Sequence, residues 1–301
     1  MDALANNWLV LCGGGFLGFA AGILTGLFGA GGGFIVTPVL NIFLGLPMNI
    51  AVGTSACQVL GASAFSLYHH YEKKLFGIRV ALTMLIGIPF GSYLGASIVK
   101  KLALLKPIMV AGRELKTVDF VLLLTFAVFL SLIAAWLFYD NFHIRKDVQD
   151  IDEKSHTGFL SKLKIYPVMK YRTIHLGEFS STVLVLLGFS MGFLSGLLGI
   201  GGGVFIIPIL FYLVGQETKF AIKTGTMLVL ACGFFATICH AFERNIDYTL
   251  SAFLITGAFF GTKIGARIQK RLSGKDIRKY LSFVILAAVL IVIFKLSKMI
   301  F

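Results

Sequence analysis

The amino-acid sequence predicts an all-α polytopic membrane protein, built as two inverted repeats of about five segments each with glycine-broken helices. Hydrophobic residues make up 57% of the 301 residues and charged residues only 14%. A water-soluble domain carries roughly 25% charged residues, so this chain could not cover a soluble surface. Long apolar runs recur along the chain, and one glycine-rich segment occurs twice. The composition excludes a water-soluble enzyme, a disordered chain and a disulfide scaffold.

Most apolar runs reach the roughly 20 residues that a helix needs to cross a bilayer. The runs cover about 8–28, 34–46, 50–68, 80–98, 118–139, 180–198, 203–215, 221–240, 248–266 and 280–297. Two of them, 34–46 and 203–215, are too short to cross unaided. Each follows a glycine cluster and contains one proline, Pro38 or Pro208. We therefore expect the helix to be broken at both places.

The glycine-rich segments belong to an internal repeat. Residues 22–40 and 192–210 align at an offset of 170 without a gap, and 10 of the 19 positions are identical. The same offset continues to relate threonines, histidines and glycine runs further along the chain. Two structurally equivalent halves follow, a first membrane repeat over 1–140 and a second over 180–301. Between them, 141–179 is predicted to be a cytosolic charged loop with an interfacial stretch.

The distribution of Lys and Arg predicts how the halves are oriented. If each glycine-broken pair returns the chain to its starting side, four loops share one side: 69–79, 140–178, 215–223 and 263–279. They hold 19 of the 27 Lys and Arg residues, against 8 on the other side. If each pair crosses once, the sides hold 13 and 14. The positive-inside rule favours the first arrangement, which makes the repeats inverted and places both termini outside.

The two glycine clusters are the first candidate substrate-binding residues. They comprise Gly29, Gly31, Gly32 and Gly33 in the first half, and Gly199, Gly201, Gly202 and Gly203 in the second. Adjacent glycines interrupt a helix, and inside a membrane the freed backbone groups must face protein or a water-filled cavity. A new helix begins after each cluster, and its free N–H groups and positive dipole end favour an anion. The alternative interpretation is that the glycines only permit tight packing.

Polar residues of the third segment in each half are further candidates for the substrate site. They are Thr54, Ser55 and Gln58 in the first half, and Thr224 and Thr226 in the second. Hydroxyls and amides can hydrogen-bond an oxyanion, and they can equally cap a helix or bond a neighbouring one.

His70 and His240 occupy equivalent places at the far ends of those same segments. They are candidates for a proton relay, the alternative being polar residues satisfied near an interface.

Glycines at four-residue spacing predict close helix packing rather than a ligand site. One stripe is Gly14, Gly18, Gly22 and Gly26, and its counterpart is Gly188, Gly192 and Gly196; two more are Gly87, Gly91, Gly95 and Gly257, Gly261, Gly265.

Residue types that are missing also bear on function. No carboxylate lies deep in any segment, which argues against a cation substrate. The four cysteines lack metal-ligand spacing, so neither a metal nor a cofactor is expected. The net charge is +13, and the basic residues lie between apolar runs. There we expect them to determine the topology and to contact anionic lipid rather than nucleic acid. The expected partners are a small anionic substrate and the lipid bilayer.

The repeated segments, Gly26-LFGAGGGFIVT-Pro38 and Gly196-LLGIGGGVFII-Pro208, together with AVGTSA at 51–56, resemble the TauE/SafE family of sulfite exporters. The resemblance implies a secondary transporter of the cell membrane that exports sulfite or an organosulfonate. An anion channel on the same scaffold is the alternative. An intramembrane hydrolase is remote, because nothing pairs Ser55 with a histidine. The chain departs from the short family pattern in its long loop over 140–178, and in Lys223, where the first half has Gly53.

Overall fold

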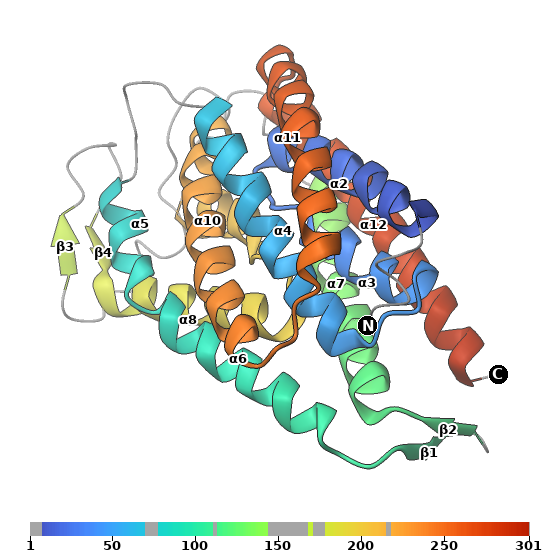
Figure 1. Ribbon diagram of the computed structural model, residues 1–301. Helices are drawn as coiled ribbons and strands as arrows, with labels where there is room; N and C mark the ends of the chain where they lie inside the picture. The colour runs from blue at the N-terminus through green and yellow to red at the C-terminus, as the bar shows by residue number, and fades with distance from the viewer. Residues whose placement is uncertain are drawn as a thin grey trace.

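The computed structural model describes residues 8–69, 78–110, 113–143, 168–170, 178–214 and 218–300, and these residues are almost entirely helical (Figure 1). The first half contains α2 (Trp8–Phe28), α3 (Gly33–Phe43), α4 (Met48–His69), α5 (Ile78–Leu85), α6 (Ile88–Ala103) and α7 (Thr117–His143). The second contains α8 (Ser181–Leu198), α9 (Gly203–Pro208), the π-helix η3 (Ile209–Leu213), α10 (Thr218–Phe242), α11 (Tyr248–Arg271) and α12 (Gly274–Ile300). Two short antiparallel pairs complete it, β1 (Ile108–Val110) with β2 (Arg113–Leu115), and β3 (Val168–Lys170) with β4 (Glu178–Ser180).

Within the described residues, seven helices are long and apolar enough to cross a membrane, or eight if the bent pair α5–α6 is one span. The predicted all-α polytopic architecture is therefore confirmed. The two short segments are also confirmed, as α3 and as the continuous pair α9–η3. The π-helical turn follows Pro208, whose ring removes a backbone donor and so disturbs the regular ladder.

Three boundaries differ from the sequence prediction. The single run expected at 80–98 is bent by 41° between α5 and α6, where Pro89 enters the first turn of α6. The stretch between the runs expected at 80–98 and 118–139 contains the hairpin β1–β2, which lies near the C-terminal end of the chain in Figure 1. Helix α7 continues to His143, beyond the boundary predicted at 140. Most of the predicted charged loop lies outside the described residues.

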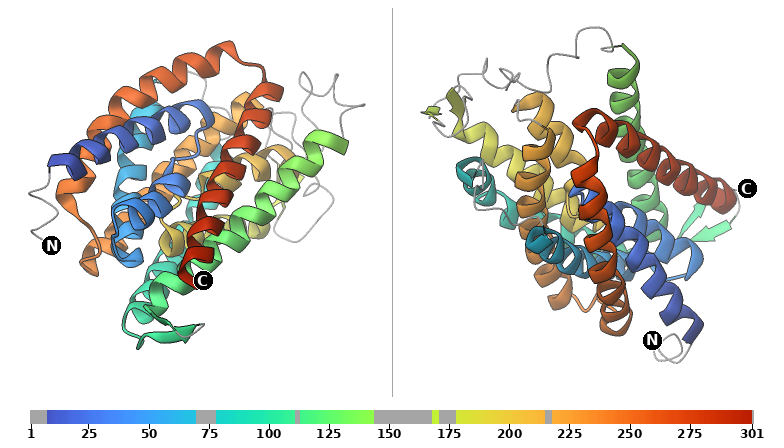
Figure 2. Two further views of the ribbon diagram at one scale, coloured as in Figure 1. Left: turned by 90° about the vertical axis from the view of Figure 1, so that its right-hand side faces the viewer. Right: turned by 90° about the horizontal axis from the view of Figure 1, so that it is seen from above.

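The first helix of each half packs against the fourth helix of the other half. Helix α2 lies along α11, as both views of Figure 2 show, and α8 lies along α6. A Cβ atom on Gly18 would lie 2.1 Å from the carbonyl oxygen of Leu254, and one on Gly188 would lie 2.0 Å from that of Met84. These two contacts are related by the same offset of 170 residues. The glycine stripes thus serve helix packing, as predicted, and they do so between the halves.

Helices α4 and α10 are the equivalent third helices, and they lie side by side at the centre of Figure 1. They run in opposite directions: Gly53 packs against Asn245 and His240 at one end of the pair, and Gly233 packs against Leu60 further along. Helices α7 and α12 pair on one side of this centre, as the left view of Figure 2 shows.

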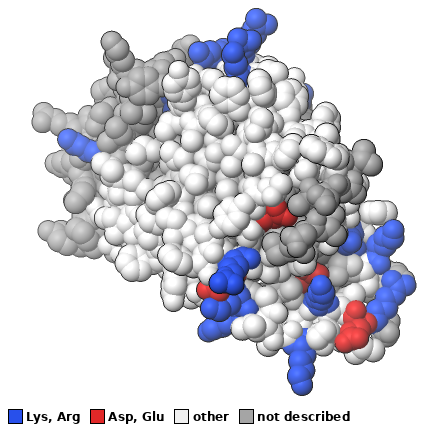
Figure 3. Space-filling view, in the orientation of Figure 1, with Lys and Arg blue, Asp and Glu red and all other residues white. Residues whose placement is uncertain are grey.

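Charged side chains concentrate toward the two ends of the molecule in Figure 3, separated by a wide band without them. At the upper end of Figure 1 lie the helix ends next to 70–77, 215–217 and 271–274. At the lower end lie the helix ends next to 43–48 and 242–248. The apolar band is the surface expected for the hydrocarbon core of a bilayer.

Candidate substrate-binding site

Both glycine clusters adopt a backbone conformation that other residues resist. Gly29, Gly31 and Gly32 have φ values of 68°, 80° and 70°, and the equivalent residues Gly199, Gly201 and Gly202 have 68°, 73° and 70°. This left-handed region costs a residue with a Cβ atom roughly 1–2 kcal/mol. The left-handed conformation of these glycines therefore interrupts the right-handed helix, and it does so in the same way in each half.

The two breaks meet at the centre of the protein. A Cβ atom on Gly33 would lie 2.3 Å from the carbonyl oxygen of Gly199, and one on Gly203 would lie 2.1 Å from that of Ala30. All residues of 29–33 and 199–203 are buried. The repeat has thus brought two segments 170 residues apart in the sequence into direct backbone contact.

Two equivalent valines fill the space in front of the breaks. Val59 and Val229 are fully buried, and each lies within contact distance of both Gly31 and Gly201. The sequence left open whether protein or a water-filled cavity faces the breaks. In this conformation the side chains of these two valines lie directly against both breaks.

The new helices begin without side-chain caps. Gly32 and Gly202 occupy the cap positions of α3 and α9, and among the described residues neither helix start has a side-chain cap hydrogen bond. The amides of Ile35 and Val36 bond to the carbonyl of Gly32, which leaves the donors before them without a helical partner. This arrangement fits the predicted anion preference, because uncapped N–H groups and the positive dipole end remain at each break.

The three polar candidates of α4 have different surroundings. The hydroxyl of Ser55 lies 3.4 Å from the carbonyl oxygen of Gly33 and 3.1 Å from that of Gly199, so it links the two breaks. The hydroxyl of Thr54 accepts a 3.0 Å hydrogen bond from the amide of Asp247. The side chain of Gln58 is fully buried, and neither its nitrogen nor its oxygen has a hydrogen-bond partner among the described residues.

The candidates of α10 are buried and less available. Thr226 donates its hydroxyl hydrogen to the carbonyl of Ile222, 2.8 Å away in the same helix, and Thr224 is 4% exposed. His240 is fully buried although it lies in the last turn of α10, and its Nε2 is 2.8 Å from the carbonyl oxygen of Gly196. His240 thus lies at the end of its segment, as expected, and is enclosed there by protein. His70 lies outside the described residues.

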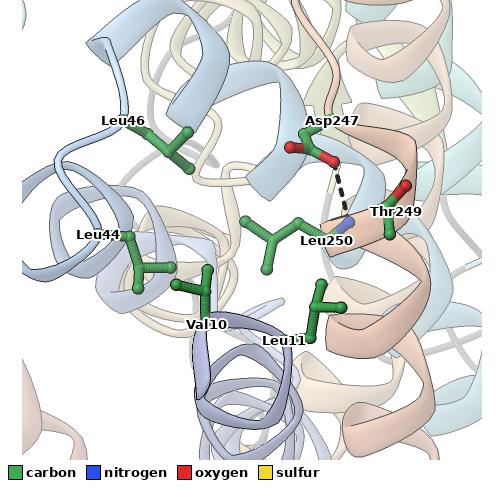
Figure 4. Close-up of a pocket in the computed structure, with 7 residues that line it drawn as sticks. All are labelled: Val10, Leu11, Leu44, Leu46, Asp247, Thr249 and Leu250. Carbon is green, nitrogen blue, oxygen red and sulfur yellow. Dashed lines mark hydrogen bonds between the residues drawn. The ribbon is translucent and has the colours of Figure 1, made fainter. Parts of the chain in front are cut away.

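A small pocket opens at the lower end of Figure 1, between the starts of α2 and α11 and the end of α3 (Figure 4). It is lined by Val10, Leu11, Leu44, Leu46, Asp247, Thr249 and Leu250, and it has room for about one water molecule. Asp247 caps α11 by accepting a 3.0 Å hydrogen bond from the amide of Leu250. The sequence prediction did not include Asp247. An Asp before an apolar run indicates a helix cap, but nothing in the sequence places it beside Thr54.

Within the described part of the chain, no group of three His, Cys, Asp or Glu residues could hold a metal ion. A bundle of apolar helices with two broken helices that meet at its centre defines a multi-pass membrane transporter. The chain belongs to the sulfite exporter TauE/SafE family, whose model matches residues 14–292.

Similar proteins include a probable membrane transporter protein, YunE, of Bacillus subtilis, with 26% identity over 87% of this chain and 89% of the relative. Another is a probable membrane transporter protein, MJ0441, of Methanocaldococcus jannaschii, with 27% identity over 89% of this chain and 90% of the relative. A sulfite exporter TauE/SafE family protein 3 of Arabidopsis thaliana is 33% identical over 28% of this chain and 18% of its own length. No solved structure matches the chain. These findings make the chain a multi-pass transporter of the cell membrane.

Proposed function

We propose that this chain is a secondary transporter that exports a small sulfur-containing anion, sulfite or an organosulfonate. The observation that carries the proposal is the contact of two uncapped, glycine-broken helix starts at the buried centre. Paired helix breaks near the midplane are where secondary transporters bind ions and substrates. The description of the matching family model supports sulfite as the substrate class.

The balance of buried charge supports an anion. Among the described residues no Asp or Glu is buried, so no carboxylate is available to neutralise a cation in the interior. The donors at the breaks are uncharged backbone amides. They can stabilise negative charge through the dipole of the helices that follow them.

The arrangement of the halves supports alternating access rather than a fixed pore. The equivalent helices α4 and α10 run in opposite directions, which is the relation that inverted repeats require. Helix α2 of the first half packs against α11 of the second half, and α8 of the second half packs against α6 of the first. We infer that these crossed pairs move as units around α4 and α10, and that such a movement separates Val59 from Val229.

The test is flux through purified protein in liposomes loaded with labelled sulfite, with methanesulfonate and sulfate tested in parallel. A carrier saturates as the internal anion concentration rises, whereas an anion channel on the same scaffold gives flux that continues to rise with concentration. Absence of protein-dependent flux of sulfite or a sulfonate would refute the proposed substrate class.

Three glycines with the same backbone conformation provide matched variants for this assay. Gly32→Ala introduces a Cβ atom 2.7 Å from the carbonyl oxygen of Ala21, and Gly202→Ala introduces one whose nearest neighbour is 3.3 Å away. Gly45→Ala carries equal backbone strain, at φ 65°, but meets nothing within 4 Å. We expect flux to fall in the first two variants and to persist in the third. Equal flux in all three would mean that the breaks do not take part in transport.

A further inference from the structure

The last turns of α11 carry basic side chains on the face that points away from the protein. The exposed basic residues there are Lys263, Arg267, Lys270 and Arg271, whereas Thr262, Gly265, Ala266 and Gln269 of the same turns are buried. The buried face packs on α2, where a Cβ atom on Gly265 would lie 2.2 Å from the carbonyl oxygen of Ile23. The side chains of Lys263 and Arg267 therefore leave the helix on its outer side.

Apolar side chains share this outer face. Phe260, Ile264 and Ile268 are 57%, 39% and 40% exposed, and they follow one another at four-residue spacing. Lys263 and Arg267 have the same spacing, which places their Cβ atoms about 5–6 Å apart on the helix surface. The outer face thus combines a row of apolar groups with an adjacent row of cations.

The two cations lie at the depth of lipid phosphate groups. Helix α11 begins at Tyr248, and roughly 20 helical residues cross the hydrocarbon core, which brings the boundary of the core to about Arg267. Lys263 is one turn earlier, about 6 Å inside that boundary at a rise of 1.5 Å per residue. A lysine at this depth extends its ammonium group outward to the interface while its methylene groups stay in apolar surroundings.

The positive charge of this face is not neutralised by neighbouring carboxylates. Among the described residues, the ion pair is that of Lys100 with Glu243, at the end of α6. The carboxylate of Asp276 accepts a 2.7 Å hydrogen bond from Ser273 at the start of α12. On the face visible in Figure 3, the Lys and Arg side chains at the upper end have no described Asp or Glu beside them.

The equivalent face in the first half carries no charge at the same two positions. At the offset of 170 residues, the counterparts of Lys263 and Arg267 are Tyr93 and Ser97 of α6. Helix α6 packs on α8 as α11 packs on α2, with a Cβ atom on Gly95 at 2.3 Å from the carbonyl oxygen of Phe193. The same helix contact therefore forms without the cations, so packing does not account for them.

We propose that the outer face at the end of α11 is a docking surface for one anionic phospholipid. The lipid phosphate lies between Lys263 and Arg267, since a guanidinium binds phosphate through two parallel hydrogen bonds and an ammonium adds a point charge. An acyl chain lies along Phe260 and Ile264. The sequence predicts contact with anionic lipid for the basic residues in general, whereas the structure assigns this lipid to one face of one helix. The proposal does not depend on which anion the protein transports.

The test is a titration of the purified full-length protein in detergent with dioleoylphosphatidylglycerol or dioleoylphosphatidylcholine, followed by native mass spectrometry. The two lipids share their acyl chains and phosphate, and the choline group of the second cancels its charge. Each Lys or Arg near a membrane surface favours an anionic lipid about fivefold, so two of them predict a preference of about 25-fold. Equal retention of the two lipids would refute the docking surface.

Lys263→Tyr combined with Arg267→Ser converts this face to the residues of its counterpart. We expect the double variant to lose at least tenfold of the preference for phosphatidylglycerol. Its melting temperature without lipid should stay within about 2 °C of the original, because both positions are exposed. Lys263→Gln combined with Arg267→Gln removes the same charges with less change of shape, and it serves if the first variant does not fold.

Lys101→Gln combined with Lys106→Gln is the matched control, because it removes two exposed lysines that follow one another at the end of α6. It should keep the full preference. A control that loses the preference as strongly as the α11 variants would show that net charge, and not this face, attracts the lipid. Soluble glycerol 3-phosphate should not displace the lipid; displacement at equal concentration would show that the site binds a free phosphate group, and the lipid would be refuted as its occupant.

Discussion

Replacement of glycine by alanine usually stabilises a helix, but at the contact between α2 and α11 we expect it to destabilise the protein. In an exposed helix, alanine stabilises over glycine by about 1 kcal/mol because glycine loses more backbone entropy on folding. Gly13 represents this case, since a Cβ atom there would meet nothing within 4 Å. Gly18 lies on the same helix, but its Cβ atom would be 2.1 Å from the carbonyl oxygen of Leu254.

The expected magnitudes follow from that difference. An ordinary contact needs 3.4 Å, so Gly18→Ala is 1.3 Å short and the two backbones must separate. Overpacking costs about 1–3 kcal/mol, and a clash with backbone lies at the upper end of this range. After subtracting the helical gain, we expect a loss of about 2 kcal/mol, or a fall of about 4–8 °C in melting temperature. Gly13→Ala should instead raise the melting temperature by about 2–4 °C.

The assay is the fraction of a fluorescent-protein fusion that remains monodisperse in detergent after heating. Gly188→Ala extends the test to the second half, because its Cβ atom would lie 2.0 Å from the carbonyl oxygen of Met84. It should lose as much stability as Gly18→Ala. If both variants are stabilised as Gly13→Ala is, the helices are not in backbone contact and the exchange of helices between the halves is wrong.

Three further predictions concern the links between the halves and the topology. Ser55→Ala leaves the carbonyls of both glycine breaks without their hydroxyl donor, so we expect a loss of about 1–3 kcal/mol, measured as a lower melting temperature; an unchanged value would count against the link. The Lys100–Glu243 ion pair, at 2.9 Å, is partly exposed on both sides, so Lys100→Gln should change the melting temperature little and less still in high salt. In a cysteine-free background, Arg113→Cys should react with an impermeant thiol reagent on intact cells, and Lys275→Cys only after permeabilisation; the reverse pattern would exclude the predicted orientation.

Several features of the fold follow from sequence alone because bilayer physics constrains them strongly. A hydrocarbon core admits only long apolar helices, so the spans could be located by length and hydropathy. The short segments after the glycine clusters were also predictable, since consecutive glycines interrupt a helix whatever surrounds them. The bend between α5 and α6 was missed, although Pro89 in the sequence was a signal for it.

The class of protein, the repeat and the places where the helices break could all be predicted from residue patterns. Which helices meet could be learned only from the folded chain. A glycine stripe indicates that a neighbour comes close but does not identify it, and only the folded chain places Gly18 on Leu254 of the other half. In the same way Ser55 was one polar candidate among several, until the fold placed its hydroxyl beside the carbonyl oxygens of both Gly33 and Gly199. Sequence patterns specify one helix at a time, whereas a binding site is a property of the space between helices.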